Sequence, residues 1–137
     1  MNRYSWEDIA LGMEEHFSVT VTEEMLEHFR LITGDENPLH KDEAFAKEKG
    51  YSGKVAFGML TASFLSTLAG VYLPGERSLI HSVESKFVKP VFPGDELTVS
   101  GTVAEMDERF QILRLKVVIS NQKGEKVLKG AMQIGML

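Results

Sequence analysis

The stretch from Val55 to Leu73 runs for nineteen residues without a charged side chain, and it constrains the fold more than any other part of the chain. A run of that length is about what a helix needs to cross a bilayer. However, it contains glycine, serine and threonine residues, and it lies between amphipathic segments that need a common core. We therefore expect a buried helix over about residues 57–73, ended by Pro74 and Gly75, rather than a membrane span.

Beyond this helix, apolar and polar residues alternate in the pattern of strands. Pro93-Gly94-Asp95 predicts a turn, and the connections at residues 107–108 and 121–124 are short enough for antiparallel hairpins. We expect four long strands. The residues predicted to share one face of each are Leu79, His81, Val83, Ser85 and Phe87; Leu97, Val99, Gly101 and Val103; Leu113, Leu115, Val117 and Ile119; and Leu128, Gly130, Met132, Ile134 and Met136.

The first third of the chain predicts one short strand and two helices. The strand is expected at about residues 17–21. Thr22 is placed to cap a helix that Gly34 ends, and Asp42 is placed to cap a shorter one that Gly50 ends. The residues expected to form the apolar face of the first helix are Met25, Phe29 and Ile32.

These elements predict an α+β fold in which an antiparallel sheet curls around a long central helix, rather than alternating βαβ units. The chain has no internal repeat, low-complexity tract or long linker, so residues 1–137 are expected to form a single domain.

Composition excludes several classes of function. A formal net charge of −5 argues against non-specific binding of nucleic acid. The chain has no cysteine, which excludes thiolate chemistry and fits a reducing cytoplasm, the location we expect. The first twelve residues do not resemble a signal peptide. His16, His28 and His81 lack metal-ligand spacing and no glycine-rich phosphate loop is present, so we expect no metal and no cofactor.

The segment from Phe29 to His40 carries the most informative chemistry. Asp35 and His40 flank a turn at Asn37-Pro38, which can direct a carboxylate and an imidazole into one cavity. Such a pair can remove a proton from water and return it. A turn-capping aspartate and a surface histidine give the same spacing, so spacing alone leaves both interpretations open.

The same segment resembles the signature of the MaoC-like, R-specific enoyl-CoA hydratases. The match runs from Phe29 through Gly34, Asp35 and Asn37-Pro38-Leu39-His40 to Ala44 and Phe45. It continues in Gly58-Met59-Leu60, Leu73-Pro74-Gly75 and the segment from Phe87 to Asp95, and covers about residues 10–135. The resemblance implies the hot-dog fold. One position departs from it, since Phe57 stands where many relatives have a histidine.

The resemblance implies that Asp35 and His40 activate one water molecule, which adds to a trans-2-enoyl thioester to give an (R)-3-hydroxyacyl thioester. It implies that the backbone N–H of Gly58 stabilises the thioester oxygen, and that Ser66 lies near the pair and orients Asp35. A packing role for Ser66 is nearly as well supported. Asn37 is a secondary candidate for substrate contact and is expected mainly to shape the loop.

Several alternatives share these features. A dehydratase for a branched, aromatic or carrier-bound acyl thioester would use the same pair. A hot-dog thioesterase usually needs a carboxylate near the central helix, and residues 55–73 contain none. A non-catalytic thioester-binding subunit would not need the pair. The resemblance also implies a homodimer with acyl-CoA or an acyl-carrier thioester as substrate. If coenzyme A binds, Lys86, Lys89 and Arg114 are candidates for contacts with its phosphates, although a place on a solvated strand face is the simpler interpretation of each.

Overall fold

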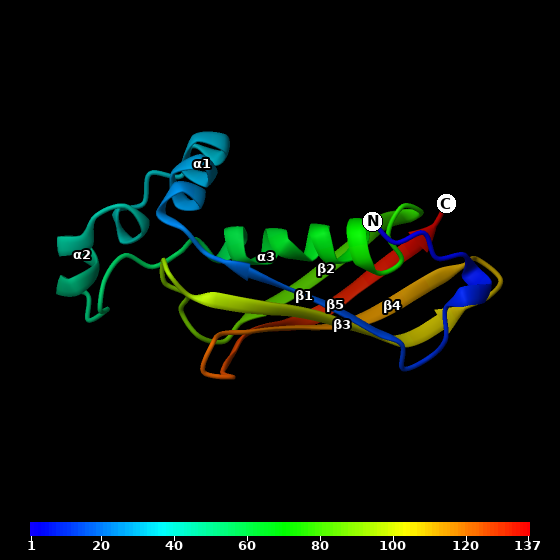
Figure 1. The fold of residues 1–137 in the computed structure, drawn as a ribbon. Helices are drawn as coiled ribbons and strands as arrows, with labels where there is room; N and C mark the ends of the chain where they lie inside the picture. The colour runs from blue at the N-terminus through cyan, green and yellow to red at the C-terminus, as the bar shows by residue number, and fades with distance from the viewer.

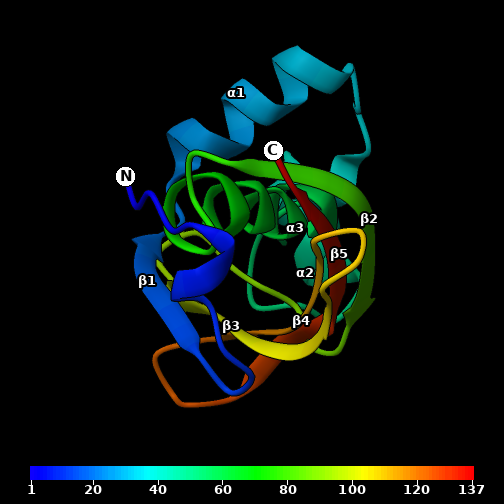
Figure 2. The ribbon, with the colours of Figure 1, turned by 90° about the vertical axis from the view of Figure 1, so that its right-hand side faces the viewer.

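The computed structural model describes residues 1–137, which form an antiparallel sheet of five strands in the order β1-β3-β4-β5-β2. The sheet curls around helix α3 (Gly58–Thr67), as Figures 1 and 2 show. The predicted α+β architecture is therefore confirmed. The strands are β1 (Glu14–Thr20), β2 (Ser78–Phe87), β3 (Glu96–Asp107), β4 (Ile112–Ser120) and β5 (Lys126–Met136).

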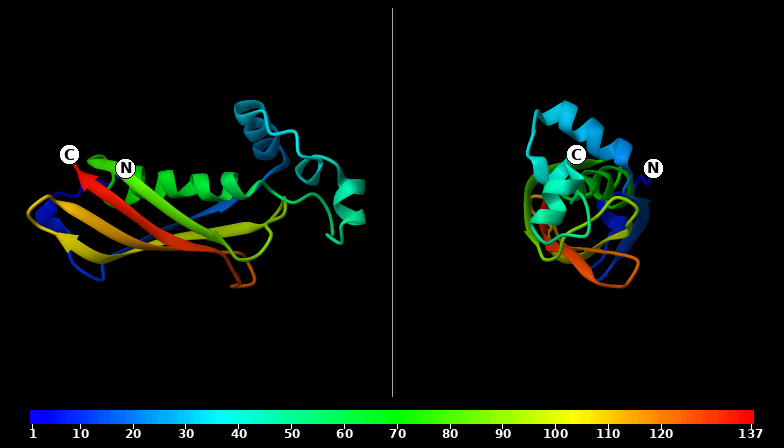
Figure 3. Two further views of the ribbon diagram at one scale, coloured as in Figure 1. Left: turned by 180° about the vertical axis from the view of Figure 1, so that it is seen from behind. Right: turned by 90° about the vertical axis from the view of Figure 1, so that its left-hand side faces the viewer.

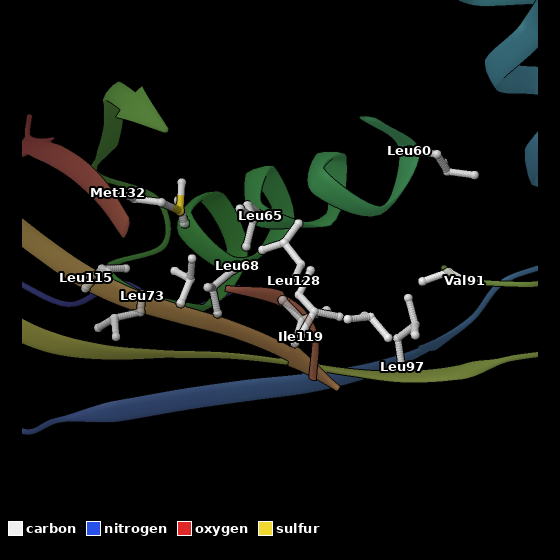
Figure 4. Packing of buried hydrophobic residues seen from close by; sticks show 14 of the residues in the cluster. Leu60, Leu65, Leu68, Leu73, Val91, Leu97, Leu115, Ile119, Leu128 and Met132 are labelled. Atoms are coloured by element: carbon white, nitrogen blue, oxygen red, sulfur yellow. The ribbon is translucent and has the colours of Figure 1, made fainter. Parts of the chain in front are cut away.

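The core lies between the concave face of the sheet and one side of α3 (Figure 4). The predicted inward residues of β3 and β4 are buried, because a pleated strand turns alternate side chains to the same face. On β5, Leu128, Met132 and Ile134 are fully buried. Leu65 and Leu68 fill the helix side of this core.

The central helix matches its expected length. It continues beyond α3 as one wider π-type turn, Leu68–Tyr72, and ends before Pro74. The sheet covers one side only, so Met59, Ser63 and Ser66 remain exposed on the other. None of the helices in the structure combines the length and the apolar character that a membrane span requires.

Strand β2 differs from its predicted pattern. A β-bulge between Ile80 and Ser82 inserts one residue against β5, which shifts the alternation by one position. Ile80 pairs with the buried Ile134 and shares its face with Val83. The prediction that Leu79 and His81 lie on this face is therefore wrong, whereas Val83 and Phe87 keep their expected orientation.

The helical layer beyond the end of the sheet follows its predicted caps (Figures 1 and 3). Helix α1 (Glu23–Thr33) begins where Thr22 Oγ1 accepts a hydrogen bond from the N–H of Met25 at 3.1 Å, and it ends at Gly34 in the left-handed region with φ 74°. Helix α2 (Glu43–Glu48) is capped by Asp42 Oδ1, which accepts from the N–H of Phe45.

The predicted apolar face of α1 is wrong at Ile32, which is 82% exposed. Helix α1 contacts the body of the protein along a narrower stripe that contains Met25, the buried Leu26 and Phe29. Because α1 lies outside the curled sheet, above α3 (Figure 2), its last turn projects away from the core.

Gly101 determines how closely the helix approaches the sheet. A Cβ atom on Gly101 of β3 would lie 2.9 Å from Leu68 Cδ2, which is shorter than real contacts allow. We expect Gly101→Ala to lower the free energy of unfolding by about 1–3 kcal/mol through overpacking. Thr98→Ala, an exposed position on the same strand, should change it by less than about 0.5 kcal/mol. Urea denaturation measures both, and equal effects would contradict this packing.

Candidate active site

A cavity of about 750 Å³ opens between the uncovered side of α3, the inner face of β2 and helix α1. Its walls are mainly apolar, and Asp35 and His40 are the titratable side chains among them. The lining residues are Phe29, Thr33, Asp35, His40, Phe57, Gly58, Met59, Ala62, Ser63, Leu65, Ser66, Ile80, Val83 and Phe87.

The loop after α1 is shaped by short-range hydrogen bonds. The N–H of Asp35 donates to Thr33 Oγ1 at 3.2 Å, and Asp35 Oδ1 accepts from the N–H of Asn37 at 3.0 Å. Asn37 Oδ1 in turn accepts from the N–H of Leu39 at 3.0 Å and begins the 3₁₀ turn Pro38–His40. These are the Asx-type turns that Asp and Asn favour. They leave Oδ2 of Asp35 without a hydrogen bond inside the protein.

His40 is oriented by a main-chain carbonyl. Its Nδ1 lies 2.6 Å from the oxygen of Val55. A carbonyl oxygen only accepts, so Nδ1 carries a hydrogen and donates it, and in the neutral ring Nε2 keeps the free lone pair. Nε2 makes no hydrogen bond with the protein. The imidazole therefore presents a proton acceptor that is available to a bound molecule.

Gly58 opens α3 at the wall of the same cavity. The first N–H groups of a helix have no partner within it, and here Phe57, at the cap position, offers no side-chain acceptor. The N–H groups of Gly58 and Met59 make no hydrogen bond in the structure. The positive end of the helix dipole adds to their attraction for a negatively charged oxygen.

The structure brings Asp35, His40, Gly58 and Ser66 together around one cavity, whereas Asn37 lies outside its lining. Ser66 is exposed, and its hydroxyl makes no hydrogen bond to Asp35 or to the backbone of its own helix. The roles of these five residues in catalysis and substrate binding remain predictions.

Comparison with known proteins identifies the family of the chain. A family model described as MaoC like domain matches residues 9–123, most of the chain. The chain belongs to this MaoC-like family. It is 30% identical over 127 residues to the (R)-specific enoyl-CoA hydratase of Rhodospirillum rubrum, covering 91% of this chain and 86% of that protein. It is 37% identical over 102 residues to the (R)-specific enoyl-CoA hydratase of Aeromonas caviae, covering 74% and 76% respectively.

The solved structure of the (R)-hydratase from A. caviae involved in PHA biosynthesis superposes on this MaoC-like chain with a TM-score of 0.92. The sequences are 30% identical, and the match covers 96% of this chain and 99% of the other. The hot-dog fold is therefore confirmed. With relatives of this class, the chain is a hydro-lyase, an enzyme of the hydratase and dehydratase type.

Sequence reasoning missed part of this MaoC-like site. The sequence marks Phe57 only as a departure from the family pattern and does not predict its contact with His40, whose ring centroid lies 4.3 Å from that of Phe57. Ile80 lines the cavity because of the bulge in β2, and no sequence signal marked that bulge. Val83 and Phe87 also line the cavity, and their alternation in the sequence already indicated an inward face.

The three candidate phosphate contacts lie in different places. Lys89 pairs with Glu125 and lines a smaller cavity of about 280 Å³ that also includes His40 and Gly58. Lys86 and Arg114 line separate surface hollows, and neither hollow includes Asp35 or His40. No cluster of three or more His, Cys, Asp or Glu side chains is arranged to hold a metal ion.

An ion-pair network spans the outside of the loop. Glu36 lies next to Asp35, and its carboxylate accepts from Lys41 Nζ at 2.6 Å and also from Arg30 of α1. The hydrogen bond from Lys41 has the largest effect and that from Arg30 the next largest, and together they hold the pKa of Glu36 below its usual value. Since the folded pKa is lowered, the stabilisation is present above the pKa of Glu36 in the unfolded chain. It is lost as the pH falls through the folded value.

We expect Lys41→Ala to raise the pKa of Glu36 toward its ordinary value, because the first of its two cationic partners is removed. Lys47→Ala is the matched control, since Lys47 pairs with Glu43 instead, and it should leave the Glu36 titration unchanged. Carboxyl-detected NMR titration measures both variants. An unchanged Glu36 pKa in Lys41→Ala would contradict the network.

Proposed function

We propose that this protein is an R-specific enoyl-CoA hydratase, which adds water reversibly to a trans-2-enoyl thioester to give an (R)-3-hydroxyacyl thioester. One observation carries the proposal. Asp35, His40 with its unbonded Nε2, and Gly58 with its unpaired N–H all line one largely apolar cavity. The pair can handle a proton, the N–H can stabilise a negative oxygen, and the apolar walls suit an acyl chain.

In the proposed reaction, a water molecule is held between Asp35 and His40. As its oxygen forms a bond to C3 of the enoyl thioester, Nε2 of His40 takes one proton and the Asp35 carboxylate accepts a hydrogen bond from the other. The C2–C3 double-bond electrons move into the thioester, whose oxygen becomes an enolate oxygen. The N–H of Gly58 stabilises that charge, and losing such a donor would raise the barrier by about 3 kcal/mol.

The second step returns the proton. His40 Nε2, now protonated, donates to C2, the enolate collapses, and the thioester carbonyl re-forms. Because one water molecule between the two residues supplies both the hydroxyl group and the proton, both add to the same face of the double bond. Every proton is accounted for by the pair and the water, so the proposed chemistry uses no metal and no cofactor.

The acyl group is proposed to lie in the apolar cavity between α3 and β2, with its carrier leaving past His40. Coenzyme A is the proposed carrier, as the names of the relatives suggest. A dehydratase for a carrier-protein-bound, branched or aromatic acyl group would use the same three groups, and only the preferred thioester would differ. The absence of a carboxylate from residues 55–73 weighs against thioester hydrolysis.

We further propose that two copies pair through β2, which lies at an edge of the sheet. Unpaired edges invite association, and β2 exposes apolar side chains, with Leu79 50% and Phe87 52% exposed. The exposed Met59 of α3 lies in the same cavity wall as Phe87. A second copy on this edge would cover apolar surface that a single chain leaves open.

We expect Asp35→Asn and His40→Asn each to lower kcat by at least about 10²-fold with folding intact, because each removes a proton-handling group. The assay follows loss of the enoyl absorbance of crotonyl-CoA together with free thiol and the configuration of the product. Thiol release would indicate a thioesterase, and an (S) product would contradict the stereochemistry. Wild-type rates in either variant would remove that residue from the mechanism.

We expect Leu79→Lys to convert the dimer to a monomer, because it places a charge on the proposed paired edge while Leu79 lies outside the cavity. Ser18→Lys on β1, the opposite edge, should leave the dimer intact. Light scattering after size-exclusion chromatography gives the mass directly. A wild-type monomer, or dissociation by Ser18→Lys alone, would contradict pairing through β2.

A further inference from the structure

Phe57 packs against the ring of His40. Its side chain is 3% exposed, and its ring centroid lies 4.3 Å from that of His40, with 32° between the ring planes. The ring of Phe57 also packs against the ring of Phe29 of α1, and the two ring centroids lie 4.9 Å apart. The ring of Phe57 is thus held in the core while it packs on the imidazole.

The hydrogen bond to Val55 does not orient His40 by itself. The terminal torsion of a histidine side chain is broad, so one bond at Nδ1 fixes an edge of the ring and leaves its plane free to swing. The direction of Nε2 changes with that plane. Some contact on the ring face must therefore restrict the swing, and Phe57 supplies it.

The backbone around Phe57 is fixed at both ends. The N–H of Val55 donates to the oxygen of Leu39 at 3.1 Å, and the N–H of Ala56 donates to the oxygen of Val91 at 2.7 Å. Phe57 then occupies the cap position of α3, directly before Gly58. One short segment therefore holds the edge of the imidazole, its face, and the N–H proposed to stabilise the enolate.

We propose that Phe57 is a positioning residue for the hydration reaction, which aims Nε2 of His40 at the water by bracing the face of its ring. The inference rests on the proposed function of the same site. Phe57 offers His40 no hydrogen bond, so it leaves Nε2 free, whereas a histidine at this position would bring a competing donor and acceptor. This chain therefore orients its proposed base by packing.

Phe57→Ala should lower kcat for crotonyl-CoA by about tenfold or more, because small misplacements of a catalytic group are costly. KM should change by less than about threefold, because the acyl cavity retains its other walls. Phe57→Leu keeps most of the volume without the aromatic ring, and its kcat should fall between wild type and Phe57→Ala. Rates are expressed per folded molecule, with the folded fraction taken from circular dichroism.

Leu73→Ala is the matched control. It also removes a fully buried side chain, but Leu73 lies beyond the end of the central helix that is farther from Gly58, and outside the cavity lining. It should lower stability and leave kcat per folded molecule unchanged. If Leu73→Ala lowers kcat as much as Phe57→Ala, or if Phe57→Ala keeps the wild-type kcat, Phe57 has no positioning role.

NMR of the free protein tests the contact without reference to activity. The His40 ring protons should show a ring-current shift in wild type that Phe57→Leu abolishes, and nuclear Overhauser effects should join the two rings. Absence of both signals would overturn the proposal. A wild-type protein that hydrates no thioester would instead remove the proposed function, while the NMR result would still decide whether Phe57 fixes the ring.

Discussion

The packing of one side of α3 into the curled sheet is the constraint on which the rest of the structure depends. Leu65 and Leu68 are buried against the inward faces of β3, β4 and β5, and Gly101 lets the helix come close. This packing fixes the position of α3 and therefore the position of its first N–H groups, which have no side-chain cap. The opposite side of α3 stays free to form a cavity wall, so one side of this helix belongs to the core and the other to the candidate site.

The sequence was a good guide wherever a local rule decides the outcome. The helix caps at Thr22, Gly34 and Asp42 depend on neighbouring residues only, and the alternation in β3 and β4 depends on burial of one face. The bulge at Ile80 in β2 depends on pairing with a distant strand, and no local pattern marks it. The exposure of Ile32 follows from the position of α1 relative to α3, which periodicity does not contain.

The candidate site shows the same division. The residues Asp35 and His40 were found through a resemblance of sequence, and the Asx turns that shape their loop are local. The carbonyl that selects the tautomer of His40 belongs to Val55, fifteen positions further along, and the aromatic contact comes from Phe57. Neither partner is detectable from side-chain chemistry, because one is a main-chain atom and the other is an apolar ring of the core.

The hydrogen bond between His40 and Val55 has an evolutionary consequence. Its acceptor is part of the backbone, so every amino acid encoded at position 55 provides the same oxygen. Point mutation at that codon cannot delete the acceptor; it can only displace it through a change in packing. The protonation pattern of the imidazole is thereby insulated from ordinary genetic drift. Variation is instead free to accumulate in the apolar walls of the cavity, so the shape of the cavity can diverge while the tautomer of His40 stays the same.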